Sequence, residues 1–227
     1  MKRLLLLGLA LGACTDGAAP EPADAAVPET WATYRIAPGA HSADLENREP
    51  RNPIDGVVDV TGRDYELALD VTAMYVLTAP AQPQDQLDWN KLPGLSDCGE
   101  IDLAADGAMF GWRWRVDLSP PVLEVTAYAN NAGTHLSVEP PLLTLDADDL
   151  TSATPLRYRV ARGIDRYVFS VEGSVRGRAI EASATLPRRC NEMPRDPLAW
   201  AGAFYFGGTS VAPHLITAQM RERTYAD

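Results

Sequence analysis

Residues 110–118 read FGWRWRVDL, and large apolar side chains alternate there with polar ones. The apolar positions are Phe110, Trp112, Trp114, Val116 and Leu118. A period of two places successive side chains on opposite faces of a strand, whereas a helix would repeat every 3.6 residues. This stretch therefore predicts a strand with one buried face and one polar face.

The same alternation recurs at short intervals along the chain. In residues 65–77 it runs through Tyr65, Leu67, Leu69, Val71, Ala73, Tyr75 and Leu77. Similar short runs occupy residues 122–129, 155–161, 166–172, 178–186, 203–207 and 214–221. Hairpin-type turns are expected at Asn130–Gly133 and Arg162–Asp165. Eight or more short strands predict an all-β fold, an antiparallel β-sandwich that is jelly-roll-like.

Residues 80–107 form a long connection between two of these strands and are rich in Pro, Asp and Gly. Within a compact domain, a connection of this length is often a functional loop. We therefore expect this stretch to contribute to whatever site the protein carries.

Length and composition limit the classes of function. The chain has 227 residues, 46% of them hydrophobic and 22% charged, which suits one globular domain preceded by a leader. Its formal net charge is −11, from 31 acidic and 20 basic residues. A protein that binds the phosphate backbone needs a basic surface, so we expect no nucleic-acid partner.

The N-terminus reads MKRLLLLGLALGAC. A positive start precedes the apolar run Leu4–Leu11, which is too short to span a bilayer as a stable helix. The run ends in a sequence that resembles the bacterial lipobox. We expect residues 1–13 to be a lipoprotein signal peptide, Cys14 to be lipidated, residues 14–30 to be a flexible tether and residues 31–227 to be a single domain.

The residue after Cys14 is Thr15 rather than Asp. In the lipoproteins that this leader resembles, Asp at that position often means retention in the inner membrane. The resemblance therefore implies an outer-membrane lipoprotein of the bacterial cell envelope. Its folded domain would lie on the periplasmic or the surface face, with the membrane as a partner through the N-terminal lipid.

Two further cysteines, Cys98 and Cys190, remain in the chain. Export implies an oxidising compartment, in which a disulfide is the default state of a cysteine pair. A metal site is disfavoured, because no His or second Cys lies at ligand spacing near either residue. We predict a disulfide between Cys98 and Cys190.

The sequence predicts no catalytic residue, metal site or cofactor. Residues 208–214 read GTSVAPH and resemble the nucleophile segment of subtilisin-like proteases, but Ser210 lacks the His and Asp motifs of those enzymes. His41, His135 and His214 are not spaced as metal ligands. Acidic clusters at 97–106 and at 146–149 offer oxygen ligands, and calcium binding there is left open.

The segment Tyr205–His214 is instead interpreted as a structural corner. Its two adjacent glycines commonly supply a positive φ, which a Cβ atom opposes. A sandwich core draws alternate residues from both sheets. We therefore expect Tyr205 or Phe206 to be buried against Trp112 or Trp114, and the corner not to be an active site.

Four arginines form a candidate ligand site. Arg113 and Arg115 alternate on one predicted strand, and Arg157 and Arg159 alternate on another. If the two strands share a sheet face, the four side chains form a basic patch on an acidic protein. The guanidinium fork suits carboxylate or sulfate groups, so such a patch would fit an acidic glycan.

Several short motifs stand out along the chain: DQLDWNKL at 85–92, SDC at 96–98, FGWRW at 110–114, VTAY at 125–128, YFGG at 205–208 and APH at 212–214. Together they resemble a family of secreted bacterial β-rich proteins of unassigned function, many of which look like lipoproteins. Relatives often carry a His pair just before the FGWRW motif, where this chain reads LAAD. The resemblance implies one exported β-sandwich domain. It supplies no reaction and no catalytic residue.

Two classes of function follow. The first is a lipid-anchored, non-catalytic binding or structural β-sandwich, whose partner is a glycan or a cell-envelope protein. The alternative is a hydrolase or lyase that acts on polysaccharide. Jelly rolls host both classes, so the fold does not choose between them. Two acids in a cleft, one of them with a raised pKa, would favour the enzyme.

Overall fold

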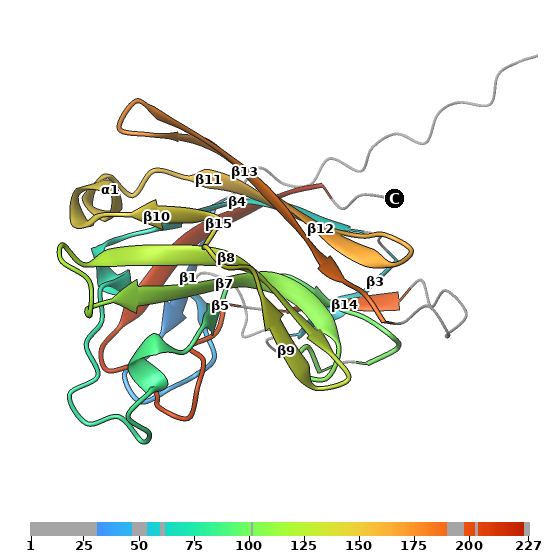
Figure 1. The fold of residues 1–227 in the computed structure, drawn as a ribbon, viewed down its shortest axis with the longest axis horizontal. Coiled ribbons are helices and arrows are strands. Elements are labelled where there is room, and N and C mark those ends of the chain that lie inside the picture. The colour runs from blue at the N-terminus through green and yellow to red at the C-terminus, as the bar shows by residue number, and fades with distance from the viewer. Residues whose placement is uncertain are drawn as a thin grey trace, which may run out of the picture.

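The computed structural model describes residues 31–46, 54–59, 62–100, 102–189, 198–202 and 204–224. These residues form two antiparallel β-sheets that pack face to face, so the predicted β-sandwich is confirmed. Figure 1 shows the sheets as two layers, with β11, β12 and β13 above β7 and β8. The predicted leader, Cys14, the predicted tether and Cys190 lie outside the described residues.

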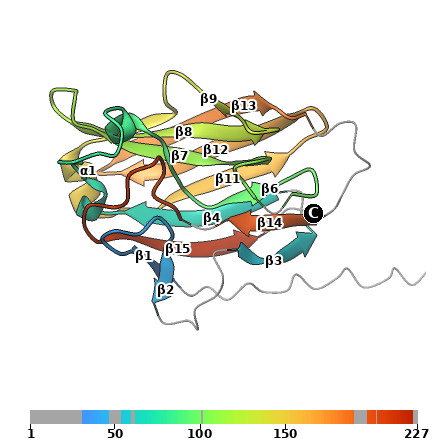
Figure 2. The ribbon, with the colours of Figure 1, turned by 90° about the horizontal axis from the view of Figure 1, so that it is seen from below.

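The first sheet has seven strands, seen side by side in Figure 2. In spatial order they are β13 (Arg178–Pro187), β12 (Arg166–Val175), β11 (Leu156–Arg162), β4 (Gly62–Leu69), β15 (Ile216–Thr224), β1 (Ala32–Ile36) and β2 (Asp44–Glu46). Strands β11, β12 and β13 are consecutive in sequence and pair as hairpins. The turn predicted at Arg162–Asp165 joins the first two of them.

The second sheet has eight strands. The main order is β10 (Leu143–Leu145), β8 (Val122–Asn131), β7 (Gly107–Arg115), β6 (Gly94–Ser96), β14 (Leu198–Gly202) and β3 (Ile54–Asp59). Two short strands, β5 (Asn90–Lys91) and β9 (Thr134–Ser137), pair with β7 and β8 respectively. The turn predicted at Asn130–Gly133 joins β8 to β9, and Ala132 and Gly133 have φ of 49° and 73° there.

The interior side of β7 carries the predicted aromatic residues. Phe110, Trp112 and Trp114 all lie in the core. The ring of Phe110 lies 5.1 Å from that of Tyr158 and 5.4 Å from that of Phe169, both on the opposite sheet. These contacts bury apolar area between the layers, which is the main favourable term for such a fold.

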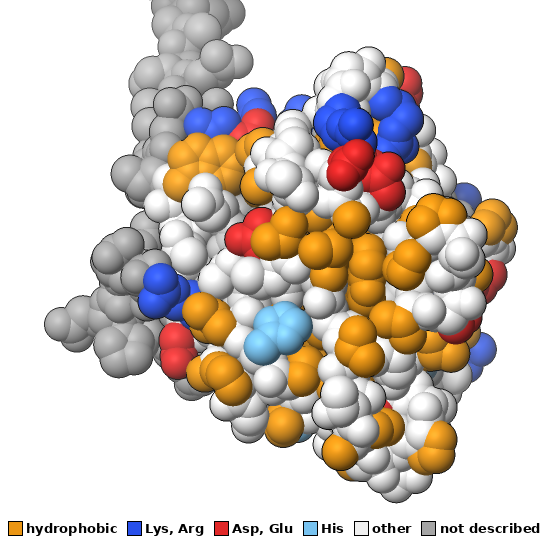
Figure 3. All heavy atoms as spheres, turned by 90° about the vertical axis from the view of Figure 1, so that its left-hand side faces the viewer, with side chains coloured by type: hydrophobic (Ala, Val, Ile, Leu, Met, Phe, Trp, Pro, Cys, Tyr) orange, Lys and Arg blue, Asp and Glu red, His pale blue; other side chains and the backbone are white. Residues whose placement is uncertain are grey.

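The alternation of residues 110–118 does not extend as far as predicted, because β7 ends at Arg115. Val116 and Leu118 are 36% and 39% exposed, in the turn that leads to β8. Val71 and Val76, which follow β4, are exposed as well. Figure 3 shows apolar side chains spread over this end of the sandwich.

The strand predicted over residues 65–77 is also shorter, since β4 ends at Leu69. The carboxylate of Asp70 accepts a hydrogen bond from the Thr72 amide at 2.8 Å and another from the Thr217 hydroxyl at 2.7 Å. A carboxylate that bonds the following backbone offers the chain an alternative to the ladder. The chain therefore turns into a 3-10 helix, η1 (Val71–Ala73).

Residues 203–207 form no regular strand in the described part of the chain, and Tyr205 makes isolated bridges with Ser42 and Lys91 instead. Phe206 is 1% exposed and packs edge to face on Trp112 with ring centroids 6.4 Å apart. The prediction that this corner packs on the tryptophans is confirmed by that contact. Gly208 has the expected positive φ, 76°.

The described residues include one α-helix, α1 (Ala147–Ser152), and a second 3-10 helix, η2 (Asp85–Leu87). Asp146 and Asp149 cap α1 reciprocally in a capping box. Arg178 pairs with Asp149 at 2.7 Å, so this acidic cluster has local structural partners.

Across the described residues, no helix combines the length and the apolar character needed to cross a bilayer.

Candidate functional site

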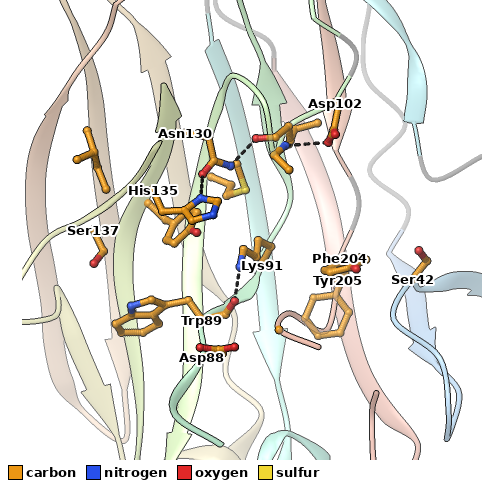
Figure 4. A pocket seen from close by; sticks show the side chains of 16 residues that line it. Ser42, Asp88, Trp89, Lys91, Asp102, Asn130, His135, Ser137, Phe204 and Tyr205 are labelled. Carbon is orange, nitrogen blue, oxygen red and sulfur yellow. Dashed lines mark hydrogen bonds between the residues drawn. The ribbon is translucent and has the colours of Figure 1, made fainter. Parts of the chain in front are cut away.

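A cavity of about 900 Å³ lies on the outer face of the eight-stranded sheet, where β7 and β8 turn the side chains that do not enter the core (Figure 4). Its apolar and aromatic lining consists of Trp89, Met109, Tyr128, His135, Leu136, Phe204 and Tyr205. Its polar lining consists of Ser42, Asp88, Lys91, Asp102, Asn130 and Ser137, and Leu103, Ala104 and Gly208 complete it.

The segment 85–92 forms one wall of the cavity and is anchored at both ends. At its start, the buried carboxylate of Asp85 accepts hydrogen bonds from the hydroxyls of Ser210 at 2.5 Å and Thr209 at 2.8 Å. Near its end, Asn90 donates to the Tyr75 hydroxyl at 3.0 Å and accepts from the Gly207 amide at 2.8 Å. These bonds hold Asp88, Trp89 and Lys91 in place between them.

Trp89 packs closely on β7 because that strand has a glycine, Gly111, at the point of contact. A Cβ atom at Gly111 would lie 3.2 Å from Cε3 of Trp89, closer than ordinary van der Waals contact. The guanidinium of Arg113 covers the ring at 3.8 Å from its centroid. Arg113 is held in turn by Glu124, with 2.8 Å between Nε and Oε2. The indole is therefore a fixed part of the wall.

Lys91 reaches the cavity from β5. Its backbone exchanges two hydrogen bonds with Tyr205, at 2.8 and 2.9 Å. Its ammonium donates to the Trp89 carbonyl and lies 4.6 Å from the centroid of the Tyr128 ring. Burial lowers the pKa of Lys91 to about 8, and the charge of Asp88 only partly opposes this shift.

Asp88 presents a carboxylate that has no partner in the part of the chain that the structure describes. Burial raises its pKa, the charge of Asp85 raises it further, and the charge of Lys91 opposes both effects. Among the described residues, no hydrogen bond or ion pair to this carboxylate is present. Gly208 leaves room for it, since a Cβ atom there would lie 2.6 Å from Oδ2 of Asp88.

Asn130 and His135 form the end of the cavity that Figure 4 shows above Lys91. Asn130 donates to the Leu103 carbonyl at 2.5 Å, and its Oδ1 lies 2.5 Å from Nδ1 of His135. Because an amide oxygen accepts, His135 donates through Nδ1, and its second nitrogen, Nε2, is not used in this contact. The imidazole can therefore hydrogen-bond a ligand through that second nitrogen.

Tyr205 lines the opposite wall. His41 stacks on its ring at 5.4 Å and 12°, and His41 donates through Nδ1 to the Phe206 carbonyl at 2.8 Å. Tyr205 is 37% exposed, so part of the ring is open to the cavity. Burial raises the pKa of Tyr205, and the charge of Asp102 adds to the shift.

The predicted patch of four arginines is wrong, because the two strands belong to different sheets. Arg113 and Arg115 lie on β7 in the eight-stranded sheet, whereas Arg157 and Arg159 lie on β11 in the seven-stranded sheet. Each pair also faces an acid. Glu124 bonds Arg113 at 2.8 Å and Arg115 at 2.9 Å.

The acid that faces Arg157 and Arg159 is the buried Asp64. It accepts from Arg157 at 2.9 Å, and Arg159 approaches it to 3.9 Å. The four guanidinium groups therefore do not form one basic surface.

The protease-like segment has a structural role. The Ser210 hydroxyl donates to Asp85 and accepts from the Ala81 amide at 2.8 Å, while Nε2 of His214 bonds the Thr72 carbonyl at 2.8 Å. Ser210 and His214 thus each hold a loop. Within the described ranges, no group of three or more His, Cys, Asp or Glu side chains is placed to hold a metal ion.

Sequence reasoning did not single out Asp88, Lys91, Tyr128, Asn130 or His135 as site residues. One signal did point to part of the cavity, since Asp88, Lys91 and Asp102 lie in the long connection expected to be functional. Leu103 and Ala104 also line the cavity. They lie where members of the family that this sequence resembles often carry a pair of histidines. The corner residue Tyr205 was expected only to support the fold.

No family model matches the chain, and no curated protein matches it. Among solved structures, the chain is similar to a mutant of the GH43 protein BlXynB from Bacillus licheniformis, at 12% identity and a TM-score of 0.41. That match covers 85% of this chain and 33% of the other, so the chain spans about a third of that protein's length.

A GH16 protein from the mixed-linkage glucan locus of Bacteroides ovatus, in complex with a product, matches at 8% identity and a TM-score of 0.35, over 85% of this chain and 79% of the other. A kappa-carrageenase from Pseudoalteromonas carrageenovora matches at 9% identity and a TM-score of 0.26. That match covers 90% of this chain and 97% of the other. These likenesses are too distant to assign a function to this chain.

Proposed function

We propose that the cavity on the eight-stranded sheet binds a carbohydrate. The observation that supports this most is the mixture of partly open aromatic rings and free polar groups around one space. The C–H faces of a sugar ring pack on aromatic rings such as Tyr205 and Trp89. Its hydroxyl groups find an acceptor at Asp88, a donor at Lys91 and a hydrogen-bonding ring nitrogen at His135.

The size of the cavity agrees with this proposal. Ligand pockets span roughly 300–1,000 Å³ and combine a mainly apolar lining with a few polar groups. The volume of about 900 Å³ lies near the upper end of that range and accommodates several linked sugar rings. Because the walls are held by hydrogen bonds that do not depend on a ligand, binding requires little reordering of the loop.

The experiment is a glycan array probed with the full-length protein, with turnover assayed for each glycan that binds. We expect binding without cleavage. Absence of binding to any glycan, together with capture of a cell-envelope protein that crosslinks through the cavity, would contradict the proposal in favour of a protein partner.

A second candidate function is a hydrolase or lyase acting on polysaccharide. One observation favours it: Asp88 has a raised pKa, as a general acid requires, and Asp102 provides a second carboxylate in the same cavity. Glycosidases place two such groups roughly 5–10 Å apart on either side of the bond. Release of new reducing ends, lost in Asp88→Asn, would establish this function instead.

The lipid anchor is part of the same proposal. A lipid on Cys14 would hold the domain at the bacterial outer membrane through the 14–30 tether, where envelope glycans are at hand. Metabolic labelling with palmitate tests this, and we expect Cys14→Ser to lose the label. Label retained in that variant would contradict an anchor at Cys14.

A further inference from the structure

We propose that the cavity is selective for an uncharged sugar, which lies between the carboxylate of Asp88 as hydrogen-bond acceptor and the ammonium of Lys91 as donor. This inference rests on the proposed carbohydrate binding and adds the class of ligand. It replaces the acidic glycan that the arginine patch would have required.

Asp88 is the acceptor side of this arrangement. An ionised carboxylate has only acceptor sites, about four of them, and so can receive two neighbouring hydroxyl groups at once. In the described structure the carboxylate of Asp88 receives none from the protein. A partly buried carboxylate without donors is costly, and two sugar hydroxyls would satisfy it.

Lys91 is the donor side. One ammonium proton is used by the Trp89 carbonyl, and the face of Tyr128 stabilises the charge without accepting a full hydrogen bond. An ammonium has three donors, so protons remain for oxygens of a ligand. Asp88 and Lys91 are three residues apart on the same anchored segment, and Figure 4 shows both side chains at the cavity.

The charge balance of the lining disfavours an acidic sugar. Of the described side chains around the cavity, Asp88 and Asp102 carry carboxylates and Lys91 carries an ammonium. A uronate or sulfate ester would bring its negative charge to a wall with more acids than cations, on a chain of net charge −11. The arginines that could compensate are engaged by Glu124 on this face and by Asp64 on the other sheet.

A positively charged amino sugar would be attracted by Asp88 and Asp102, but it would have to bind beside the ammonium of Lys91 at the same wall. The Trp89 carbonyl and the Tyr128 ring already surround the ammonium of Lys91, and the burial that lowers its pKa would penalise a second cation as well. A second ammonium nearby would add repulsion to that desolvation cost. A neutral ring avoids both penalties, and it uses the acceptor and the donor together.

The aromatic walls orient such a ring. In the view of Figure 4, Trp89 and Tyr205 lie on either side of Asp88 and Lys91. His41 covers one face of Tyr205, and Arg113 covers one face of Trp89, so each ring is supported from behind. A pyranose that stacks on these rings has its edge hydroxyls directed at the polar pair.

Isothermal titration calorimetry of the full-length protein at pH 7 tests the inference. The probes are neutral oligosaccharides derived from β-glucan, xylan and mannan, acidic ones derived from polygalacturonate and alginate, sulfated carrageenan oligosaccharides, and chitosan oligosaccharides. We expect saturable binding only within the neutral set. Asp88→Asn and Lys91→Met should each weaken that binding at least tenfold, with melting temperatures close to that of the wild type.

Arg159→Gln is the matched control, because Arg159 lies on the other sheet and is 54% exposed, and we expect its affinity to be unchanged. Tighter binding of an acidic, sulfated or amino oligosaccharide would overturn the selectivity while supporting carbohydrate binding. Unchanged affinity in Asp88→Asn would overturn the role of the polar pair. Binding of none of the probes, with all variants folded, would overturn this inference and the proposed function together.

Discussion

Gly208 allows the carboxylate of Asp88 to lie against bare backbone. Its φ is 76°, and a Cβ atom there would lie 2.6 Å from Oδ2 of Asp88. A side chain introduced at Gly208 would therefore have two effects. It would strain the left-handed backbone, and it would displace the carboxylate of Asp88.

We predict that Gly208→Ala lowers the free energy of unfolding by about 1–3 kcal/mol, measured by urea denaturation. Gly133→Ala is the control, since Gly133 has a φ of 73° and open space around its Cβ position. Gly133→Ala should therefore lower the free energy of unfolding through backbone strain alone. Equal losses in the two variants would mean that the contact with Asp88 contributes nothing to stability.

Lys91 provides a prediction about pH. Its pKa in the folded protein is about 8, below the value of an unfolded lysine, because burial penalises the ammonium. The unfolded chain therefore binds more protons between these two values. The contribution of Lys91 to the free energy of unfolding must then rise as pH increases from about 8 to about 10.4, the value of an unfolded lysine, and stay constant below about pH 8.

The measurement is the pH dependence of amine labelling at Lys91, followed by peptide mapping, which separates it from Lys2. We expect a midpoint near pH 8 in the folded protein and a return to the ordinary value in urea. Asp88→Asn should shift the midpoint lower still, because the charge of Asp88 stabilises the ammonium. An ordinary lysine midpoint in the folded protein would contradict the buried position of this side chain.

At the scale of elements, Asp97 joins the two sheets at one edge. It follows β6 of the eight-stranded sheet and is 1% exposed. Its carboxylate accepts from Arg188 at 3.0 Å, from Arg162 at 3.1 Å and from Tyr167 at 2.8 Å, all on or beside strands of the seven-stranded sheet. Although burial alone would raise its pKa, the hydrogen bonds from Arg188, the Cys98 amide and Tyr167 hold the pKa of Asp97 below its usual value.

We predict that Asp97→Ala lowers the free energy of unfolding by about 3–5 kcal/mol, because it removes a buried carboxylate that accepts hydrogen bonds from Arg188, Arg162 and Tyr167. In Asp165→Ala the lost ion pair is with Arg166, and both side chains are exposed to solvent, so the loss of stability should be much smaller. Urea denaturation at pH 7 compares them. If the two variants lost similar amounts of unfolding free energy, Asp97 would contribute no more to stability than an exposed ion pair does.

The same carboxylate sets a direction for acid unfolding. Because the pKa of Asp97 is lowered in the folded state, its contribution is complete above the ordinary aspartate value of about 4. It is lost as pH falls through the folded pKa. The difference in stability between wild type and Asp97→Ala should therefore shrink in acid.

At the scale of the whole molecule, the contact of Asp97 with Arg188 brings two distant parts of the chain together. Cys98 follows Asp97, and Cys190 is two residues beyond Arg188. Cys190 lies outside the described residues, so the disulfide stays a prediction. The contact between their neighbours favours it.

We predict one disulfide between Cys98 and Cys190, identified by peptide mapping without reductant. The loop it closes has about 90 residues, for which the chain-entropy model gives up to about 4.5 kcal/mol. Cys98→Ser should lower the free energy of unfolding by an amount in that range. Two reactive thiols in the denatured, unreduced protein would show that the bond is absent.

The alternation of apolar and polar residues was sufficient to predict the strands that build the core. In β7 the spacing of Phe110, Trp112 and Trp114 predicted which side chains are buried, because alternation depends only on neighbouring residues along one strand. Alternation did not predict where these strands end. The capping carboxylate of Asp70 follows the end of β4 at Leu69, and a turn follows the end of β7 at Arg115. Alternation also missed short strands such as β5, whose pairing depends on a distant segment.

The β-sandwich class and the burial of the β7 aromatics could be predicted from sequence alone, and residues 80–107 contribute to the cavity as expected of a long connection. Which strands share a sheet became clear only from the folded chain, in which Arg113 and Arg157 lie on different sheets. The fold also brings Lys91, Tyr128 and Tyr205 to one cavity. The physical reason is that alternation is a local property of a strand, whereas sheet order is set by pairing between segments far apart in the chain.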